Sequence, residues 1–265
     1  MYWFLRQARK LLFKIKNPKD IILNLLHDQK EHLLVKNKKI IFSIPNWLCR
    51  WRANNFLIKE PDTIKWINTF KTKDIFWDIG ANNGNFSIYA AKFKQCRCYA
   101  FEPSVFNLEI LARNIFYNRL EDNIVVVPLA VGAKTGPDML HMSSTELGGA
   151  FSSFSEPVAS GGEKLNVRFR FSALALSLDN AVEKLGLPQP DHLKIDVDGL
   201  EHRVLEGGPR CLQKIKSALV EMTPGYRSQE SVIHRLMTKA GLVRCSNTET
   251  GYSGPGSLNV IWMRK

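Results

Sequence analysis

The amino-acid sequence predicts an α/β fold, built on a mostly parallel β-sheet with helices on its faces. Three observations favour this class. From residue 75 onward, short apolar segments of strand length alternate with longer segments of helical periodicity, as in parallel sheets joined by crossover helices. A glycine-containing turn follows the first strand-like segment, and an acidic residue ends the second. The 265 residues, 45% of them hydrophobic, are also enough to bury a sizeable core.

The expected strands and helices alternate along the chain. We expect parallel strands at Ile75–Ile79, Arg97–Glu102, Ile124–Leu129, His192–Asp196 and Ala218–Met222. We expect helices at Asn85–Phe93, Ser104–Asn118, Asp179–Leu185, Glu201–Gly207 and Gln229–Ala240. A final pair of strands, Leu242–Cys245 and Ser257–Trp262, would complete the sheet.

The sequence divides into a basic N-terminal extension, residues 1–73, and a domain, residues 74–265, with an insertion at 134–172. We expect helices and short strands in the extension. The insertion is rich in Ser, Gly and Phe, and its stretch Leu165–Phe171 alternates like a strand. This pattern predicts a hairpin-like insertion between the third and fourth parallel strands. Long insertions at the carboxyl edge of such sheets often cover the active site.

Most of the net charge of +12 lies near the start of the chain. The first 73 residues hold 16 of the 37 lysines and arginines but only five of the 25 acids, so they can meet phosphates or anionic lipid. Residues 1–16 have the periodicity of an amphipathic helix with a basic face. Two interpretations stay open: this helix docks on the domain, or it makes a peripheral contact with an anionic membrane.

The chain carries no signal for secretion or for a membrane span. Arg6 interrupts the apolar run at the start, no small-residue cleavage site follows, and no stretch is long enough to cross a bilayer. The five cysteines match no disulfide or zinc spacing, which predicts reduced thiols. We therefore expect a cytoplasmic protein, with attachment to the inner face of the membrane as the alternative.

The strongest local motif is the turn after the first strand, Phe76-Trp-Asp-Ile-Gly-Ala-Asn-Asn-Gly-Asn-Phe-Ser87. Gly80 would allow a sharp turn beside a ligand, and Gly84 a close approach of that ligand to the following helix. Free N–H groups at a helix start attract a carboxylate, such as that of S-adenosyl-L-methionine, and Asp78 could hold its ammonium. The dinucleotide motif would need glycine at Asn82. A purely structural turn remains the alternative.

The second motif is Glu102, which closes the next strand 18 residues after Gly84. An acid at this position is placed to accept hydrogen bonds from the two hydroxyls of a ribose. Pro103 ends the strand, and Ser104 can cap the helix that follows. A solvated loop acid is the alternative for Glu102 alone, and the pairing of the two motifs favours ribose binding.

The third motif, around the end of the fourth strand, carries the catalytic candidates Asp196, Asp198, Glu201 and His202. Methyl transfer to an alcohol requires an aligned nucleophile and a group that removes its proton, which a carboxylate or a histidine can do. Two carboxylates could instead share a divalent cation, although no metal site is predicted. The structural alternative is that Asp198 and Glu201 cap a helix. Glu221 ends the fifth strand and would face the same crevice.

Together and in this order, these motifs resemble the FkbM family of S-adenosylmethionine-dependent methyltransferases. One departure is Asp198, where the family more often has Glu, and this puts a direct contact of that side chain with substrate or metal in doubt. The matching stretches are Lys59–Thr63 with Trp66, Asp78–Ser87, Phe101–Ser104 with Leu111 and Asn114, Ser177–Asp179, Lys194–Glu201 and Val204–Gly207.

The resemblance implies a class I methyltransferase fold, Rossmann-like, with seven strands of which the last is antiparallel. It implies O-methylation, commonly of sugars in surface polysaccharides or of hydroxyls in natural products. Asp196 would lie near the reacting methyl group. The cofactor site would comprise Glu102 at the ribose, Leu129 and Ala130 near the adenine, and, around the methionine end, Asp78, Gly80, Asn82, Gly84 and Ser87, with Pro103 and Asp196 as further cofactor-binding residues.

We therefore predict an S-adenosylmethionine-dependent O-methyltransferase that acts on a hydroxyl of a small molecule or a glycan. Two alternatives remain. The basic extension suggests a nucleic-acid methyltransferase, but its charges do not interleave with a recognisable RNA-binding module, and no nucleic-acid partner is expected. A non-catalytic module that keeps the cofactor fold would be expected to lose its site residues, whereas Glu102 and Asp196 are both present.

Overall fold

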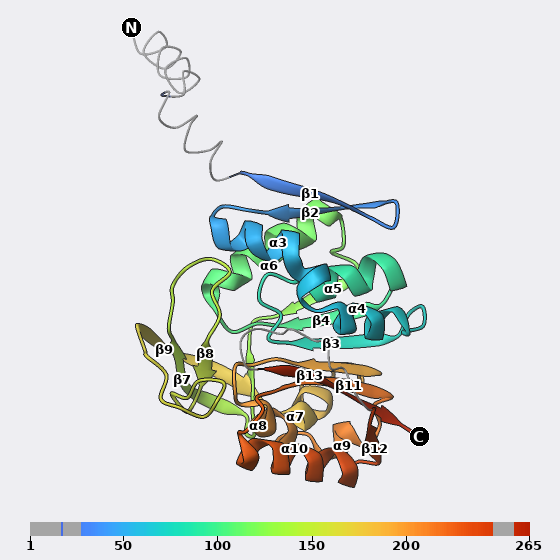
Figure 1. The fold of residues 1–265 in the computed structure, drawn as a ribbon, viewed down its shortest axis with the longest axis vertical. Coiled ribbons are helices and arrows are strands. Elements are labelled where there is room, and N and C mark those ends of the chain that lie inside the picture. The colour runs from blue at the N-terminus through green and yellow to red at the C-terminus, as the bar shows by residue number, and fades with distance from the viewer. Residues whose placement is uncertain (1–16, 18–27, 246–256) are drawn as a thin grey trace, which may run out of the picture.

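The computed structural model describes residue 17, residues 28–245 and residues 257–265. Its centre is a seven-stranded sheet with the order β12-β13-β11-β10-β3-β4-β5 (Figure 1). Strands β3, β4, β5, β10 and β11 are parallel, and β13 is antiparallel to β11. The expected seven-stranded, mostly parallel sheet with an antiparallel last strand is confirmed. The strands are β3 (Ile75–Ile79), β4 (Arg97–Phe101), β5 (Ile124–Val127), β10 (His192–Ile195), β11 (Ser217–Met222), β12 (Leu242–Arg244) and β13 (Leu258–Arg264).

Both faces of the sheet are buried, which explains why its central strands are mostly apolar. Along β3, Phe76 and Trp77 are both fully buried and belong to two different core clusters, because successive side chains point to opposite faces. Burying an aromatic or aliphatic side chain of this size contributes roughly 1.5–3 kcal/mol. The two clusters therefore hold a helical layer on each side of the sheet.

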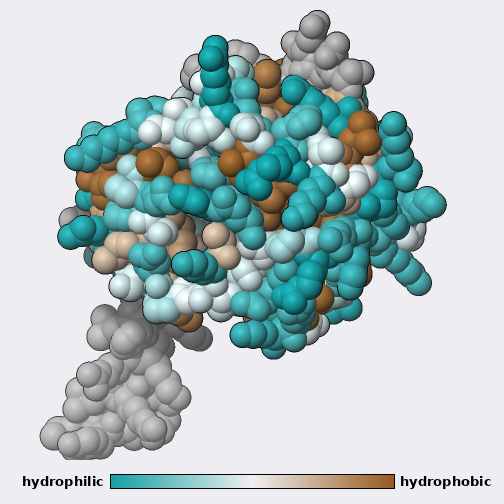
Figure 2. Space-filling view, turned by 90° about the horizontal axis from the view of Figure 1, so that it is seen from below, coloured by the Kyte–Doolittle hydropathy of each residue, from teal (hydrophilic) through white to brown (hydrophobic). Residues whose placement is uncertain are grey.

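One helical layer contains α5 (Asn85–Tyr89), which continues into a π-helical turn (Ala90–Lys94), and α6 (Val105–Asn118). The other contains α7 (Leu178–Glu183), α8 (Glu201–Glu206), α9 (Pro209–Leu212) and α10 (Arg227–Lys239). On α10, only Gln229, Ile233 and Met237 are buried, which is one face at helical spacing. The surface seen from this side is accordingly hydrophilic, with small separate hydrophobic areas (Figure 2).

The described part of the extension forms a hairpin and two helices: β1 (Lys30–Val35), β2 (Lys38–Ser43), α3 (Trp47–Lys59) and α4 (Pro61–Asn68). These elements share a hydrophobic cluster with α5 and α6. Buried amides also attach the hairpin to α6, because Asn114 Oδ1 accepts from Ser43 N at 2.6 Å and Asn118 Oδ1 from Ile41 N at 3.0 Å. The extension from residue 28 onward therefore packs against the sheet domain. The predicted amphipathic helix at 1–16 lies outside the described residues.

The insertion contributes most of a second sheet of four strands in the order β6-β9-β7-β8, to which β6 adds residues from before the predicted start of the insertion. Its strands are β6 (Ala130–Val131), β7 (Gly136–Met142), β8 (Ser152–Phe154) and β9 (Phe169–Leu176). The antiparallel β7–β9 pair is the expected hairpin-like unit. The predicted strand Leu165–Phe171 is wrong in its bounds, because pairing begins only at Phe169, opposite Met142 at the end of β7.

Two smaller expectations also fail. Ser104 precedes α6, but its hydroxyl makes no capping bond and instead its N–H donates to Glu102 Oε1 at 2.8 Å. Asp198 does not cap α8, whose N-cap residue is Leu200. Among the described residues, no helix is both long enough and apolar enough to cross a membrane.

Candidate functional site

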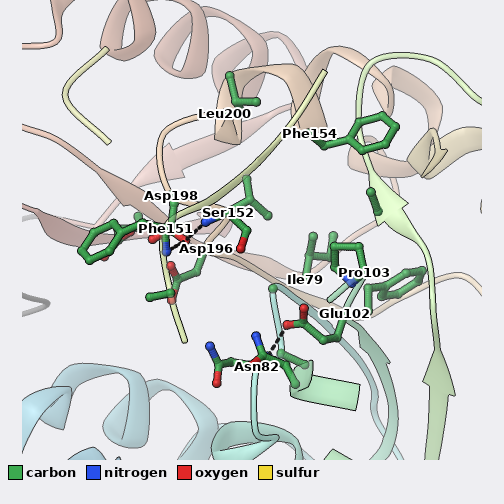
Figure 3. Close-up of a pocket in the computed structure, with 18 of the residues that line it drawn as sticks. Ile79, Asn82, Glu102, Pro103, Phe151, Ser152, Phe154, Asp196, Asp198 and Leu200 are labelled. Carbon is green, nitrogen blue, oxygen red and sulfur yellow. Dashed lines mark hydrogen bonds between the residues drawn. The ribbon is translucent and has the colours of Figure 1, made fainter. Parts of the chain in front are cut away.

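A cavity of about 1590 Å³ lies where the carboxyl ends of β3, β4 and β10 meet (Figure 3). Ligands of open α/β sheets bind at this edge, beside the point where the strand order reverses. Here the reversal falls between β3 and β10, which are neighbours in the sheet although far apart in sequence. Pockets for one small molecule typically measure roughly 300–1,000 Å³. The cavity therefore has room for a cofactor and an acceptor together.

The two motif glycines are required by contacts inside the protein. Gly80 has φ +81°, and a Cβ at this position would lie 1.8 Å from the carbonyl oxygen of Asp196. Gly84 has φ +82°, and its Cβ would lie 2.4 Å from Leu111 Cδ1 on α6. Gly80 lines the cavity and Gly84 does not. Gly80 therefore makes the expected sharp turn at the cavity wall, and both glycines let β3 and α5 pack against β10 and α6.

Asp78 and Ser87 hold the turn between β3 and α5 from behind. Asp78 Oδ2 accepts from Ser87 N at 3.1 Å and from Ser87 Oγ at 2.6 Å. Both residues are buried, and neither lines the cavity. Burial raises the pKa of Asp78, and the nearby Lys194 cation opposes that rise. The structure thus places Asp78 where it fixes the start of α5, and direct contact with a bound ammonium is not supported.

Asparagines of the same loop face the cavity instead. Asn82, Asn83 and Asn85 all line it. Asn83 Nδ2 and Asn85 Oδ1 are buried and have no hydrogen-bond partner among the described residues, although such groups are normally satisfied. One free donor and one free acceptor match the carboxylate and ammonium of an amino acid. Only Asn82 was predicted, and the signal for the others was the run Ala-Asn-Asn-Gly-Asn at residues 81–85.

Glu102 stands at the end of β4 with its carboxylate at the cavity wall (Figure 3). Its Oε2 accepts from Asn82 N and its Oε1 from Ser104 N, both at 2.8 Å. Burial raises the pKa of Glu102 to about 7, in spite of these bonds to the charged form. Pro103 and Ala130 line the same cavity. Leu129 lines it too, so the residues predicted for the ribose and the adenine of the cofactor are brought together at this cavity.

Asp196 forms an ion pair with a buried lysine that the motifs did not predict. Lys194, on β10, is 1% exposed and its Nζ lies 2.6 Å from Asp196 Oδ2. Burial alone would raise the pKa of Asp196, but the Lys194 cation lowers it below the usual value. In turn, Asp196 and other acids raise the pKa of Lys194 against the effect of its burial. Asp196 is therefore an oriented, ionised carboxylate at the cavity wall.

Glu221, at the end of β11, completes a group of three carboxylates. Oxygens of Asp196, Asp198 and Glu221 all lie within 4.8 Å of one another. Burial and the neighbouring Asp196 raise the pKa of Glu221 well above its usual value. Three carboxylates are a donor set for a divalent cation, but Lys194 already neutralises Asp196. The group equally serves to share a proton, and no metal is assigned to it.

Asp198 faces the insertion. Its Oδ2 accepts from Phe151 N at 2.7 Å and from Ser152 N at 3.2 Å (Figure 3). Its backbone is left-handed, with φ 56°, which non-glycine residues adopt only rarely. Burial and the nearby Asp196 raise the pKa of Asp198 to about 6. Asp198 also lines the cavity. Its bonds to Phe151 and Ser152 join the insertion to the edge of β10.

Glu201 and His202 lie away from the cavity wall. Glu201 Oε1 accepts from Val197 N at 3.0 Å and from Gly199 N at 3.1 Å, and Gln229 donates to its Oε2 at 2.6 Å. These bonds make it a support for the loop after β10. The His202 ring contacts Tyr226, and burial lowers its pKa. Of the four catalytic candidates, the structure brings only Asp196 and Asp198 to the cavity.

Residues 146–152 of the insertion, here named the strap, run along the cavity. Arg52 Nε donates to Gly148 O at 2.7 Å. Asn82 Nδ2 donates to Gly149 O at 2.7 Å, and Asn107 Nδ2 to the same oxygen at 3.1 Å. The strap is therefore tied to helix α3, to the β3–α5 loop and to α6 by bonds between residues far apart in sequence.

These features agree with the comparison to known families. A family model described as "Methyltransferase FkbM domain" matches residues 78–242. The chain belongs to the FkbM methyltransferase family. This FkbM protein is an S-adenosylmethionine-dependent methyltransferase with a class I, Rossmann-like fold, as the resemblance implied.

Two curated proteins are similar in sequence. The hexuronic acid methyltransferase AglP of Haloferax volcanii is 27% identical over 194 residues, which cover 72% of this chain and 73% of AglP. A tRNA (guanine(37)-N(1))-methyltransferase of Dictyostelium discoideum is 37% identical over 60 residues, which are 23% of this chain and 13% of that protein.

Solved structures show weaker similarity. The FkbM methyltransferase of Methylobacillus flagellatus aligns with a TM-score of 0.47 and 15% identity over 73% of this chain. This chain covers 44% of that protein's length. The TYW2 protein of M. jannaschii, in complex with AdoMet, aligns with a TM-score of 0.47 and 13% identity over 90% of this chain and 88% of its own. The fold assignment rests on the sheet order and the family match.

Proposed function

We propose that this FkbM protein transfers the methyl group of S-adenosylmethionine to a hydroxyl of a sugar in a glycan. The observation that carries the proposal is the ion pair of Lys194 and Asp196, which places an ionised carboxylate at the wall of a cavity with room for two ligands. The printed activity of AglP, methylation of a hexuronic acid, supports a sugar as acceptor. The match to a tRNA methyltransferase spans too little of the chain to favour nucleic acid.

The cavity residues fit the parts of the cofactor. Glu102 would accept hydrogen bonds from the ribose hydroxyls, because its carboxylate faces the cavity at the end of β4. Asn83 Nδ2 and Asn85 Oδ1, buried without partners, would bind the carboxylate and the ammonium of the methionine part. Ala130, with Pro103 nearby in the wall, offers an apolar surface to the adenine. Gly80, Gly84, Asp78 and Ser87 would act by fixing the loop.

The cofactor supplies a methyl group already activated by its sulfonium, so the protein must align the acceptor oxygen and receive its proton. Asp196 would accept a hydrogen bond from the attacking hydroxyl. As the new O–CH₃ bond forms and the S–CH₃ bond breaks, the hydroxyl proton passes to a carboxylate oxygen of Asp196. Lys194 keeps this carboxylate ionised beforehand and fixes its rotamer through the 2.6 Å contact. Asp198 and Glu201 would hold the surrounding loops in register.

Calorimetric binding of S-adenosylmethionine, followed by methyl transfer to neutral and acidic oligosaccharides, tests the proposal. We expect Glu102→Ala to weaken cofactor binding by about tenfold or more, since it removes bonds to two hydroxyls. The matched control is Glu121→Ala, an exposed acid outside the cavity. We expect Asp196→Asn to bind the cofactor normally and to lose turnover. A folded protein that binds the cofactor but methylates no sugar would contradict the proposed acceptor.

A further inference from the structure

Helix α3 presents one of its faces to the cavity, although it precedes the segment that matches the family model. Trp51, Arg52, Asn55 and Lys59 all line the cavity. Their spacing of four and seven residues places them on adjacent rows of one side of the helix. Figure 1 shows α3 and the strands of the insertion toward the same side of the molecule. This face of α3 is the part of the cavity wall that neither the motif loops nor the sheet edge supply.

Two of these residues, Arg52 and Lys59, are cations. Neither Arg52 nor Lys59 forms an ion pair within the part of the chain that the structure describes. Arg52 is oriented through its Nε, which donates to the carbonyl oxygen of Gly148 in the strap. In contrast, Lys194 is committed to Asp196. A half-buried cation loses part of its hydration, so two such cations in one wall match an anionic group on a ligand.

Both cations face the place where methyl transfer would occur. The positive charge of Lys59 helps to lower the pKa of Asp196. The charge of Arg52 likewise opposes the rise in the pKa of Asp198. Asp196 and Asp198 are the two catalytic candidates at the cavity wall. A group bound by Arg52 and Lys59 would therefore belong to a molecule that reaches the reaction centre.

Trp51 adds an apolar surface beside Lys59. Its half-buried ring lines the cavity, and Lys59 Nζ lies 5.9 Å from the ring centroid. Trp47, one turn earlier and 73% exposed, has its ring 6.5 Å from that of Trp51. An aromatic ring with polar groups beside it suits a ligand that is apolar on one face and polar at its edge, and a sugar ring has this character.

We propose that α3 forms an acceptor subsite for an acidic sugar, in which Arg52 and Lys59 bind the anionic group and Trp51 packs against the ring. The subsite rests on the proposed function and narrows its substrate class. The anionic group is a carboxylate on the methylated sugar or a phosphate attached to it, and both would meet the same two cations. The three residues would select the acceptor, whereas Asp196 would receive its proton.

The test uses the full chain and two matched pairs of probes. p-Nitrophenyl β-glucuronide and p-nitrophenyl β-glucoside differ in a carboxylate against a hydroxymethyl group, and UDP-glucuronic acid and UDP-glucose add a diphosphate to the same two sugars. Binding is measured by calorimetry with S-adenosylhomocysteine present, and methyl transfer from labelled S-adenosylmethionine is measured separately. The variants are Arg52→Gln, Lys59→Gln and Trp51→Ala. Arg50→Gln, an exposed cation of the same helix outside the cavity wall, is the control.

We expect the wild type to bind an acidic probe about tenfold more tightly than its neutral partner, because a charge-assisted hydrogen bond is gained. Preference for the glucuronide over the glucoside identifies the carboxylate, and preference for both UDP-sugars over both glycosides identifies the phosphate. Arg52→Gln and Lys59→Gln should abolish the preference, Trp51→Ala should weaken all the bound probes alike, and Arg50→Gln should change neither. Cofactor affinity should stay within about twofold in every variant.

Two results would overturn the subsite. One is equal binding of acidic and neutral probes by the wild type. The other is a loss of cofactor affinity in Arg52→Gln and Lys59→Gln with acceptor preference unchanged, which would assign these cations to the methionine carboxylate. Methylation of neutral sugars without any preference would contradict the subsite and leave the proposed function standing. Cofactor binding without binding or methylation of any probe would contradict both.

Discussion

Replacing Lys194 by methionine tests the idea that one buried cation keeps Asp196 ionised. The substitution keeps the unbranched chain as far as Cε but removes the charged nitrogen 2.6 Å from Asp196 Oδ2. Removing one partner of a fully buried ion pair costs about 3–5 kcal/mol, because the other charge is left uncompensated, and the lower end applies here because the Asp196 side chain is 26% exposed. Asp196 can avoid this cost only by taking up a proton. We therefore expect its pKa in the variant to rise above the value of an unfolded aspartate.

The pH dependence follows from the sign of that change. In the wild type, the folded-state pKa of Asp196 is lowered, so its ionisation stabilises the fold above the unfolded pKa of about 3.9 and this contribution is lost as the pH falls. In Lys194→Met the folded-state pKa is raised. The charged form of Asp196 is then disfavoured in the folded variant, so the unfolding free energy of the variant falls as the pH rises through the neutral range. The difference in unfolding free energy between the two proteins should be larger at pH 8 than at pH 5.

Urea unfolding at pH 5, 6.5 and 8 measures this difference. At pH 8 we expect the variant to be less stable by about 3 kcal/mol, with a melting temperature lower by roughly 6–12 °C. Turnover should fall and recover in part as the pH rises. Lys214→Met, an exposed lysine that lies outside the cavity wall, is the control and should be neutral within about 0.5 kcal/mol. A loss of stability that is small, or the same at all three pH values, would refute the reasoning.

Three further outcomes are expected. Gly84→Ala should lower the unfolding free energy by about 1–3 kcal/mol, because its Cβ would lie 2.4 Å from Leu111 on a left-handed backbone. Cofactor affinity measured on the folded protein should stay the same, and weaker binding at unchanged stability would contradict this. Because the pKa of Glu102 is raised to about 7 and its ionised form would bind ribose, cofactor affinity should increase from pH 6 to pH 8, and Glu102→Gln should remove that slope in calorimetry. Methyl transfer should survive dialysis against EDTA, because Lys194 already supplies the positive charge at Asp196; loss of activity restored by Mg²⁺ would show that the carboxylates hold a cation.

Much of the architecture could be predicted because buried strands are recognisable as short apolar segments in the sequence. A parallel strand covered on both faces is mostly apolar, and the buried residues Phe76 and Trp77 in β3 and Ala100 and Phe101 in β4 show this. The bounds of β9 were harder to predict. The alternating pattern starts at Leu165, whereas pairing with β7 starts only at Phe169. Register between distant strands depends on partners that a local pattern does not contain.

The cofactor side of the site was more predictable than the reaction centre. Glu102 was found because a strand end and a turn place it at a known edge of the sheet. Lys194 stood within the predicted fourth strand, yet its role was missed, since a lysine in a strand is expected to reach solvent and its contact with Asp196 depends on side-chain direction. Asp198 has the spacing of a helix cap. Its carboxylate instead accepts a hydrogen bond from the backbone of Phe151, which is far away in sequence.

The strap is secured almost entirely through its backbone. Side chains from elsewhere bind the carbonyl oxygens of Leu147, Gly148 and Gly149 and the N–H groups of Gly148, Phe151 and Ser152. Anchoring of this kind does not depend on which side chains the strap carries. Substitutions at positions such as Phe151 can therefore change the surface that the strap presents to an acceptor while the backbone path of the strap stays the same. Specificity can drift on a scaffold whose attachment points stay in place.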